Sequence, residues 1–261
     1  MIIQLSVLKY CGGYHRAPPL PVQIDTMSRP FVFLLPGMLC DATVWQAQIA
    51  ALSTDFTLAV PLFRGFDSFD TMADHVLAHA PPSFSVVAHS MGGRVAMEIL
   101  RRVPERVGHF IVMGTGVHPL YPGETERNRR LLEIAADGGL EAVADIWIPF
   151  MLHPDRSADT ALTAVIRSMV LGNKIDDLRG QLHAAEHRQD QSRYLATMRH
   201  KVHIVCGDND NWNPAGLHRR MHEQLADSVL EVIPRCGHMA PMEKPDAINA
   251  LLLQWLNKPL P

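Results

Sequence analysis

The sequence lacks a hydrophobic run long enough to cross a membrane. Its longest apolar stretch, residues 31–40, contains a proline and a glycine, and it falls well short of the roughly 18 apolar residues that a transmembrane helix needs. The N-terminus has neither an early positive charge nor a small-residue cleavage site, which argues against a signal peptide. We therefore expect a cytoplasmic protein that has no membrane partner.

Cysteines are also few, and positive and negative charges nearly balance. The 261 residues include four cysteines without C-x-x-C spacing, which predicts a reducing compartment rather than a disulfide framework. The formal net charge is −3, and no cluster of lysine and arginine marks a nucleic-acid surface. The sequence has no phosphate-binding glycine loop, so it implies no nucleotide cofactor.

Short apolar runs bounded by turn residues predict buried parallel strands. Helical patterns lie between the first three of these runs, and strands that alternate with helices imply a mostly parallel, doubly wound α/β sheet. The 47% of apolar residues suffices for one large core. The predicted strands cover residues 31–35, 84–89, 109–116 and 201–207, and the helical patterns cover residues 42–52, 71–80 and 94–103.

The succession of strands stops between residues 119 and 195, where helical segments follow one another. A long helical insertion between two strands is typical of a cap, so we predict a core of residues 29–118 and 196–261 and a cap at 119–195. Residues 1–28 include the proline-rich segment RAPPLP, and we expect this extension to be loosely attached. The alternative is that residues 2–10, which partly alternate, form an edge strand.

The segment VVAHSMGGR places Ser90 between an apolar run and a helical pattern. A serine at a sharp strand-to-helix turn stands clear of the sheet edge if its neighbours two positions away are small. Ala88 and Gly92 meet this condition, although the usual signature has glycine at both places. The amide of Met91 would then lie at a helix N-terminus, and the amide of Met38 is expected beside it, so that both could bind an oxyanion.

A serine hydroxyl becomes a nucleophile when a base accepts its proton, and the base must be oriented by a carboxylate. Asp208 and Asp210 follow the predicted strand at 201–207, and His238 precedes the last helical pattern. The chain order of serine, acid and histidine is that of one known serine hydrolase arrangement.

The segments LLPGML, AHSMGG, GDNDNWNP and CGHMAPMEKP, in this order, resemble those of the α/β-hydrolase superfamily, in its capped serine esterase branch. The resemblance covers residues 31–118 and 196–258, and it implies an α/β-hydrolase fold with a catalytic triad of Ser90, Asp210 and His238. Asp210 is selected because the family's acid lies three residues after a strand-ending glycine and four before a proline. Pro36 departs from the histidine that more often precedes the glycine of the oxyanion loop.

Large apolar side chains of the cap, together with one that follows the predicted strand at 201–207, are candidates for a substrate pocket. They are Trp147, Phe150, Met151 and Trp212. At helical spacing such side chains more often form the core of the cap itself. The expected partner is a small acyl compound, and the sequence leaves open whether the chain is a monomer or a homodimer.

These features predict a serine hydrolase that cleaves small to medium carboxylic esters through an acyl-enzyme, with no cofactor and no metal. Thioester, lactone and C–C bond hydrolysis remain alternatives, and so does a ligand-binding receptor without turnover on the same fold. His183 and His187 match an H-x-x-E-H zinc signature. We interpret this match as a coincidence within a cap helix, because a catalytic zinc site needs a third ligand.

Overall fold

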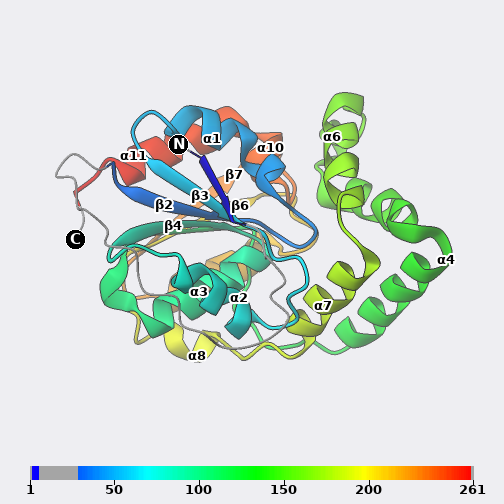
Figure 1. Cartoon of the computed structure of the whole chain (residues 1–261), viewed down its shortest axis with the longest axis horizontal. Helices are drawn as coiled ribbons and strands as arrows, with labels where there is room; N and C mark the ends of the chain where they lie inside the picture. Colours follow the sequence, from blue (N-terminus) through cyan, green and yellow to red (C-terminus); the bar gives the residue numbers. More distant parts are fainter. Residues whose placement is uncertain (1, 6–28, 260–261) are drawn as a thin grey trace, which may run out of the picture.

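The computed structural model describes residues 2–5 and 29–259. In these residues seven strands form one sheet in the order β1-β3-β2-β4-β5-β6-β7, and every pair of neighbours is parallel. The predicted parallel sheet with an inserted helical cap is thereby confirmed (Figure 1). The strands are β1 (Ile2–Leu5), β2 (Phe31–Leu35), β3 (Thr57–Pro61), β4 (Phe84–His89), β5 (Val107–Met113), β6 (Val202–Gly207) and β7 (Ser228–Ile233).

Helices cover both faces of this sheet (Figure 1). On one face α1 (Gln46–Leu52) packs against α11 (Pro245–Leu256), beside η1 (Ala42–Trp45) and α10 (Ala240–Glu243). On the other face α2 (Phe69–Ala78) packs against α3 (Met91–Arg102). The remaining core elements are η2 (Pro104–Arg106) and α9 (Ala215–Gln224).

The central strands are largely apolar because each of their two faces contributes to a separate hydrophobic core. In β4, Val87 belongs to the core under α1 and α11, whereas Val86 and Ala88 belong to the core under α2 and α3. Successive side chains of a strand point to opposite faces, so a strand covered on both sides has few polar positions.

The cap consists of α4 (Glu124–Met151), α5 (Pro154–Ser157), α6 (Thr160–Leu171), α7 (Ile175–Glu186) and α8 (Ser192–Leu195), which lie between β5 and β6. Helix α4 packs against α6 and α7, on the right-hand side of the sheet in Figure 1. A left-handed residue, Gly139 with φ 72°, divides α4 into two helical parts. Glycine adopts this conformation without steric cost, so the helix can break at this position.

The N-terminal segment corrects one prediction. Ile2–Leu5 pair with β3 as an edge strand, which is the alternative that the alternating pattern indicated and not the loosely attached tail. The backbone hydrogen bonds of a parallel ladder fix these residues. Residues 6–28, the rest of the predicted extension, lie outside the described residues.

Candidate active site

Ser90 lies at a strained turn between β4 and α3. Its φ of 53° and ψ of −120° are sparsely populated for a residue with a side chain, and such strain persists only where the surroundings impose it. Its amide donates to the carbonyl of Met113 at 2.8 Å. A Cβ atom on Gly92 would lie 2.4 Å from the carbonyl oxygen of Leu35. The turn therefore requires glycine at position 92, whereas the methyl group of Ala88 fits into the core under α2 and α3.

The hydroxyl of Ser90 meets an imidazole and a carboxylate from two distant loops. His238 Nε2 lies 2.8 Å from Ser90 Oγ, and His238 Nδ1 lies 2.9 Å from Asp210 Oδ2. Asp210 follows β6 and His238 follows β7, at the same carboxyl edge of the sheet as Ser90. The structure thus brings together the three side chains that the sequence singled out, whereas Asp208 instead accepts from the amide of Cys236 at 3.2 Å.

Asp210 is held as a charged carboxylate. Burial would raise its pKa, but the attraction of His238 and the hydrogen bonds from His238 and from the Asn213 amide outweigh burial and lower the pKa. Its Oδ1 accepts from the amides of Trp212 and Asn213, both at 2.8 Å. Both oxygens of the buried carboxylate are therefore bound, and the negative charge can orient the imidazole.

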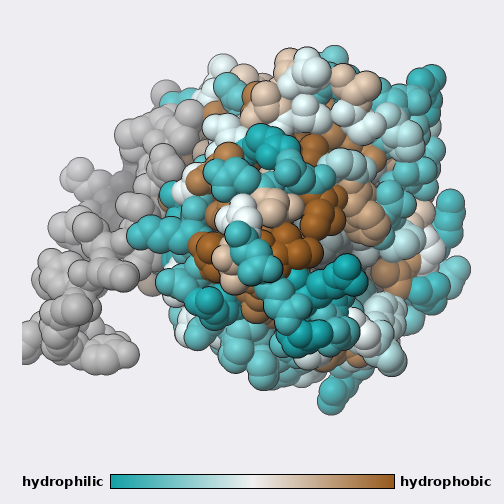
Figure 2. All heavy atoms as spheres, turned by 90° about the vertical axis from the view of Figure 1, so that its right-hand side faces the viewer, coloured by the Kyte–Doolittle hydropathy of each residue, from teal (hydrophilic) through white to brown (hydrophobic). Residues whose placement is uncertain are grey.

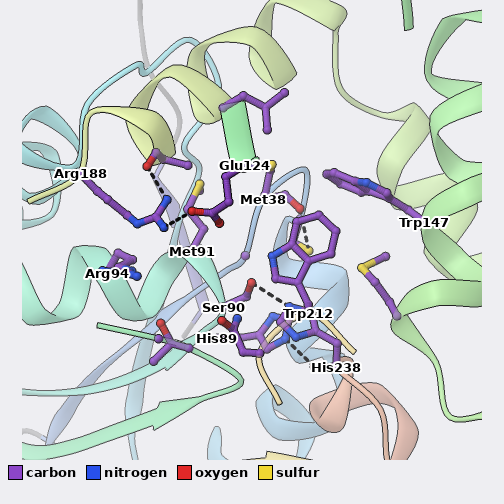
Figure 3. Close-up of a pocket in the computed structure, with 18 of the residues that line it drawn as sticks. Met38, His89, Ser90, Met91, Arg94, Glu124, Trp147, Arg188, Trp212 and His238 are labelled. Atoms are coloured by element: carbon purple, nitrogen blue, oxygen red, sulfur yellow. Dashed lines mark hydrogen bonds and ion pairs between the residues drawn. The ribbon is translucent and has the colours of Figure 1, made fainter. Parts of the chain in front are cut away.

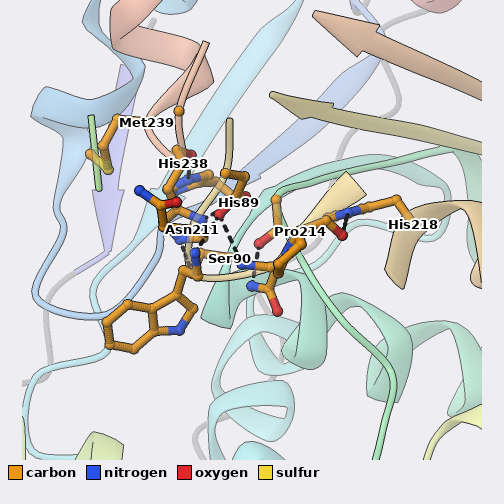
Figure 4. A network of polar contacts seen from close by, with 12 residues as sticks. His89, Ser90, Asn211, Pro214, His218, His238 and Met239 are labelled. Carbon is orange, nitrogen blue, oxygen red and sulfur yellow. Dashed lines mark hydrogen bonds and ion pairs between the residues drawn. The ribbon is translucent and has the colours of Figure 1, made fainter. Parts of the chain in front are cut away.

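The side chain of His89 holds the loop that carries His238. Its Nε2–H donates to the carbonyl oxygen of His238 at 2.9 Å (Figure 4), and a carbonyl can only accept, so this nitrogen carries the proton. Burial, followed by the nearby His238, lowers the pKa of His89 to about 3. The ring is therefore neutral near neutral pH. His89 therefore positions the backbone of His238 in addition to packing at the turn.

The carboxylate of Glu243 also holds the loop that carries His238. Its buried carboxylate accepts from the amides of Gly237 and Met239 at 3.1 Å and from the amide of His153 at 2.8 Å. The amide of His238 itself donates to the carbonyl of Met151 at 2.6 Å. The end of α4 in the cap is thereby tied directly to the histidine loop.

Two backbone amides near Ser90 are available to a ligand. In the part of the chain that the structure describes, neither the Met38 nor the Met91 amide donates to a protein acceptor. Met91 is the first residue of α3, where amides lack intrahelical partners. A Cβ atom on Gly37 would lie 3.2 Å from Ser90 Cβ, so the loop that carries Met38 runs directly beside the serine.

A cap residue that the sequence did not reveal fixes this loop. Gln181 of α7 accepts from the amide of Leu39 at 2.8 Å and donates to the carbonyl of Phe63 at 3.0 Å. Leu39 has a φ of 54°, so the loop turns sharply just after Met38. Gln181 supplies the polar anchor that Pro36, at the usual position of a histidine, cannot provide.

An open cavity lies above Ser90, with a volume of about 820 Å³ that includes the solvent at its mouth. Trp147, Met151 and Trp212 line it, as predicted, and Trp212 packs edge to face on Trp147 with ring centroids 5.5 Å apart. Phe150 is not among the lining residues. Its side chain is 44% exposed, because successive residues of a helix point about 100° apart and α4 turns Trp147 and Met151 inward.

The other end of the cavity is cationic, which the sequence did not predict. Arg94 and Arg188 line it together with Glu124 and His118, whereas the guanidinium of Arg127 lies over the ring of Trp212, 4.9 Å from its centroid. Figure 3 shows Arg94 and Arg188 on one side of Ser90 and Trp147 and Trp212 on the other. Figure 2 views the molecule from the cap side and shows hydrophobic residues gathered near the middle of that face, surrounded by polar ones.

The comparisons with known proteins agree with this geometry. A model of the alpha/beta hydrolase family matches residues 32–251. A 2-hydroxy-6-oxononadienedioate/2-hydroxy-6-oxononatrienedioate hydrolase of Escherichia coli is 29% identical over 181 residues, which make up 67% of this chain and 62% of that protein. The match therefore spans less than two thirds of this relative's length.

Solved structures share the whole fold. A malate-bound thermophilic esterase from Thermogutta terrifontis has a TM-score of 0.82 and 25% identity, over 88% of this chain and 90% of that chain. An enol-lactonase from Burkholderia xenovorans has a TM-score of 0.80 and 18% identity, over 90% and 94% of the two chains. No helix within the described residues has the length and apolar character to span a bilayer.

Proposed function

Because the chain belongs to the alpha/beta hydrolase family, we propose that it is a serine hydrolase that cleaves small to medium carboxylic esters through an acyl-enzyme intermediate. The observation that carries the proposal is the hydrogen-bonded chain from Asp210 through His238 to Ser90. The similar esterase from Thermogutta terrifontis adds support for the ester as the substrate class.

In the first half of the reaction, Ser90 Oγ forms a bond to the carbonyl carbon of the ester while its proton passes to His238 Nε2. The imidazolium keeps its Nδ1–H directed at Asp210, which stabilises the positive charge. The carbonyl oxygen becomes an oxyanion, and the amides of Met38 and Met91 are placed to bind it. The bond to the alcohol oxygen then breaks, and the alcohol leaves with the proton from His238.

In the second half, water attacks the acyl carbon while His238 accepts a proton from it. The bond between the acyl group and Ser90 Oγ breaks, the serine regains its proton from His238, and the carboxylic acid leaves. Every bond and proton is accounted for by Ser90, His238 and water. The chemistry therefore uses only groups that this chain and the solvent provide.

Hydrolysis of p-nitrophenyl butyrate tests the proposal. Ser90→Ala removes the nucleophile and is expected to lower kcat by more than about 1,000-fold. Ser83→Ala is the matched control, because Ser83 is exposed at a loop before β4, and it should keep the activity of the parent protein. Equal rates in the Ser90→Ala variant and the parent protein would contradict the proposal and favour the receptor alternative.

Cleavage of a C–C bond is the second candidate, because the Escherichia coli relative is named for the hydrolysis of a 2-hydroxy-6-oxo dienedioate. Thioesters and lactones also remain alternatives within the same chemistry. A direct comparison of kcat/KM for 2-hydroxy-6-oxononadienedioate and for p-nitrophenyl butyrate separates the two candidates. A value at least tenfold higher for the dienedioate would assign the chain to C–C bond hydrolysis instead of ester hydrolysis.

A further inference from the structure

Arg94 lies one helical turn after Ser90, on α3. Residues four apart on a helix share one face, and a long helical side chain leans back toward the N-terminus, over the preceding turn. This direction leads from Arg94 toward Ser90, and both residues line the same cavity (Figure 3). Arg94 therefore belongs to the wall of the cavity in which an ester would react.

The guanidinium of Arg94 has an unused donor. The residue is only 7% exposed, and its Nη2 donates to the carbonyl of His118 at 2.7 Å. Its Nη1 is buried and has no hydrogen-bond partner among the described residues. Buried donors of native proteins are normally satisfied, and a charged one more strictly than others. This unpartnered Nη1 belongs to a residue that lines the cavity, so it marks a place for an acceptor that the protein itself does not supply.

A second guanidinium lies beside Arg94. The side chain of Arg188 is 6% exposed, and its Nε donates to the same His118 carbonyl at 3.2 Å. Arg188 also forms an ion pair with Glu124, and Glu124 accepts from Arg127 at 3.2 Å. One carboxylate is therefore shared by two arginines, and no carboxylate of the described residues is hydrogen-bonded to Arg94.

The cavity wall thus carries more positive than negative charge. Burial, followed by repulsion from Arg188, lowers the pKa of Arg94 to about 9, against the weaker attraction of Glu124 and Asp190. An anion beside Arg94 would relieve this repulsion. A guanidinium presents its donors in a planar fork that matches a carboxylate, so this anion is expected to be a carboxylate.

We propose that Arg94, with Arg188 beside it, binds a free carboxylate of the substrate's acyl chain, so that the preferred substrates are half-esters of dicarboxylic acids. This inference rests on the proposed ester hydrolysis. Adipate, in which four methylene groups separate the two carboxyl groups, serves as the test acyl chain. The aromatic side of the cavity, with Trp147 and Trp212, is then left for the alcohol part.

The kinetic test compares two esters that differ in one charge. Mono-p-nitrophenyl adipate carries the carboxylate, and methyl p-nitrophenyl adipate has the same chain with the carboxylate capped. We expect the parent protein to prefer the charged ester in kcat/KM by about 10- to 100-fold, since a hydrogen bond to a buried charged group has this strength. Arg94→Gln should reduce the preference to nearly one, and Arg94→Lys should retain part of it.

Two further variants complete the kinetic test. Arg188→Gln should also weaken the preference, because it removes the second positive charge. Arg130→Gln removes the same charge from an exposed position of α4 and should leave the preference of the parent protein intact. Equal kcat/KM for both esters in the parent protein, or an unchanged preference in Arg94→Gln, would overturn the carboxylate subsite.

A binding measurement separates this inference from the proposed function. Calorimetric titration of the Ser90→Ala protein with monoethyl adipate and with diethyl adipate needs no turnover. We expect the half-ester to bind about 10- to 100-fold more tightly, and the double variant with Arg94→Gln to lose this difference. If the half-ester binds more tightly but the parent protein does not turn over either ester, the proposed ester hydrolysis is wrong and the carboxylate subsite is supported. If the parent protein turns over both esters without any preference, the carboxylate subsite is wrong and the proposed ester hydrolysis is supported.

Discussion

The Nε2–H of His89 donates to the main-chain oxygen of His238 at 2.9 Å, across 149 residues of sequence. The residue that precedes the candidate nucleophile thus holds the backbone of the candidate base. The ring of His89 also lies against that of His238, with centroids 5.1 Å apart. The relative position of Ser90 and His238 therefore depends on a side chain that takes no part in the proton transfer.

Replacement of His89 tests this positioning role. His89→Leu leaves the buried carbonyl of His238 without a donor, which should lower the free energy of unfolding by about 1–3 kcal/mol. It should also lower kcat more than it changes KM, because the imidazole loses its alignment with Ser90. His89→Gln keeps an N–H donor and should restore most of kcat. Equal kcat in the leucine and glutamine variants would show that His89 only fills space.

The buried His89 predicts sensitivity to acid. Its pKa is about 3 in the folded protein and about 6.5 in an unfolded chain. Between these values the unfolded chain binds a proton that the folded protein does not, so stability is fully present above pH 6.5 and falls as the pH decreases toward 3. At pH 5 the loss from this one group is about 2 kcal/mol.

Urea denaturation at pH 7.5, 6 and 5 measures this loss. The free energy of unfolding should decrease with pH, and it should decrease less steeply in His89→Gln, which lacks the titrating ring. The same slope in both proteins would show that His89 does not contribute to the acid sensitivity.

Gly92 is expected to tolerate no side chain. The Cβ atom of Gly92→Ala would overlap the carbonyl oxygens of Leu35 and Pro36, at 2.4 and 2.6 Å, and would displace the loop that carries Met38. We expect a loss of about 1–3 kcal/mol in stability together with a lower kcat. In Gly216→Ala the new atom would meet only the end of the Arg220 side chain at 3.8 Å. This control, within α9, should keep both stability and activity.

The cap residue Gln181 should affect the rate more than substrate affinity. Gln181→Met removes the acceptor of the Leu39 amide and frees the loop that positions the Met38 amide for the oxyanion. Loss of one donor to an oxyanion lowers kcat by about 100-fold or more, and a loosened donor should cause a smaller loss. Gln189→Met changes an exposed position just beyond α7 and should have no effect. An unchanged kcat in Gln181→Met would show that Gln181 does not position the loop that carries the Met38 amide.

The sequence predicted most of the sheet because strands covered on both faces are mainly apolar and appear as short apolar runs. The boundaries of β2 and β4 agree with the predicted runs at 31–35 and 84–89. Strand β3 was missed, since Pro61 at its end has no amide to donate and is typical of turns. Pairing of Ile2–Leu5 with β3 could not be decided locally, because an edge strand is defined by its neighbour.

The positions of Asp210 and His238 beside Ser90 were predictable from the sequence. All three residues follow parallel strands, and the carboxyl ends of such strands meet at one edge of the sheet. The polar wall of the cavity was not predictable in this way. Arg188 reaches Arg94 only because the cap folds over α3, and the sequence around either arginine carries no signal of the other. The position of Arg94 one turn after Ser90 was the one available clue.

Covalent labelling tests whether His238 activates Ser90. A fluorophosphonate ester reacts with an activated serine and leaves a stable adduct that mass spectrometry of peptides can place on one residue. We predict a single adduct per chain, located on Ser90, which is absent from Ser90→Ala and strongly slowed in His238→Gln. A parent protein that stays unlabelled, or that is labelled at another residue, would contradict the account.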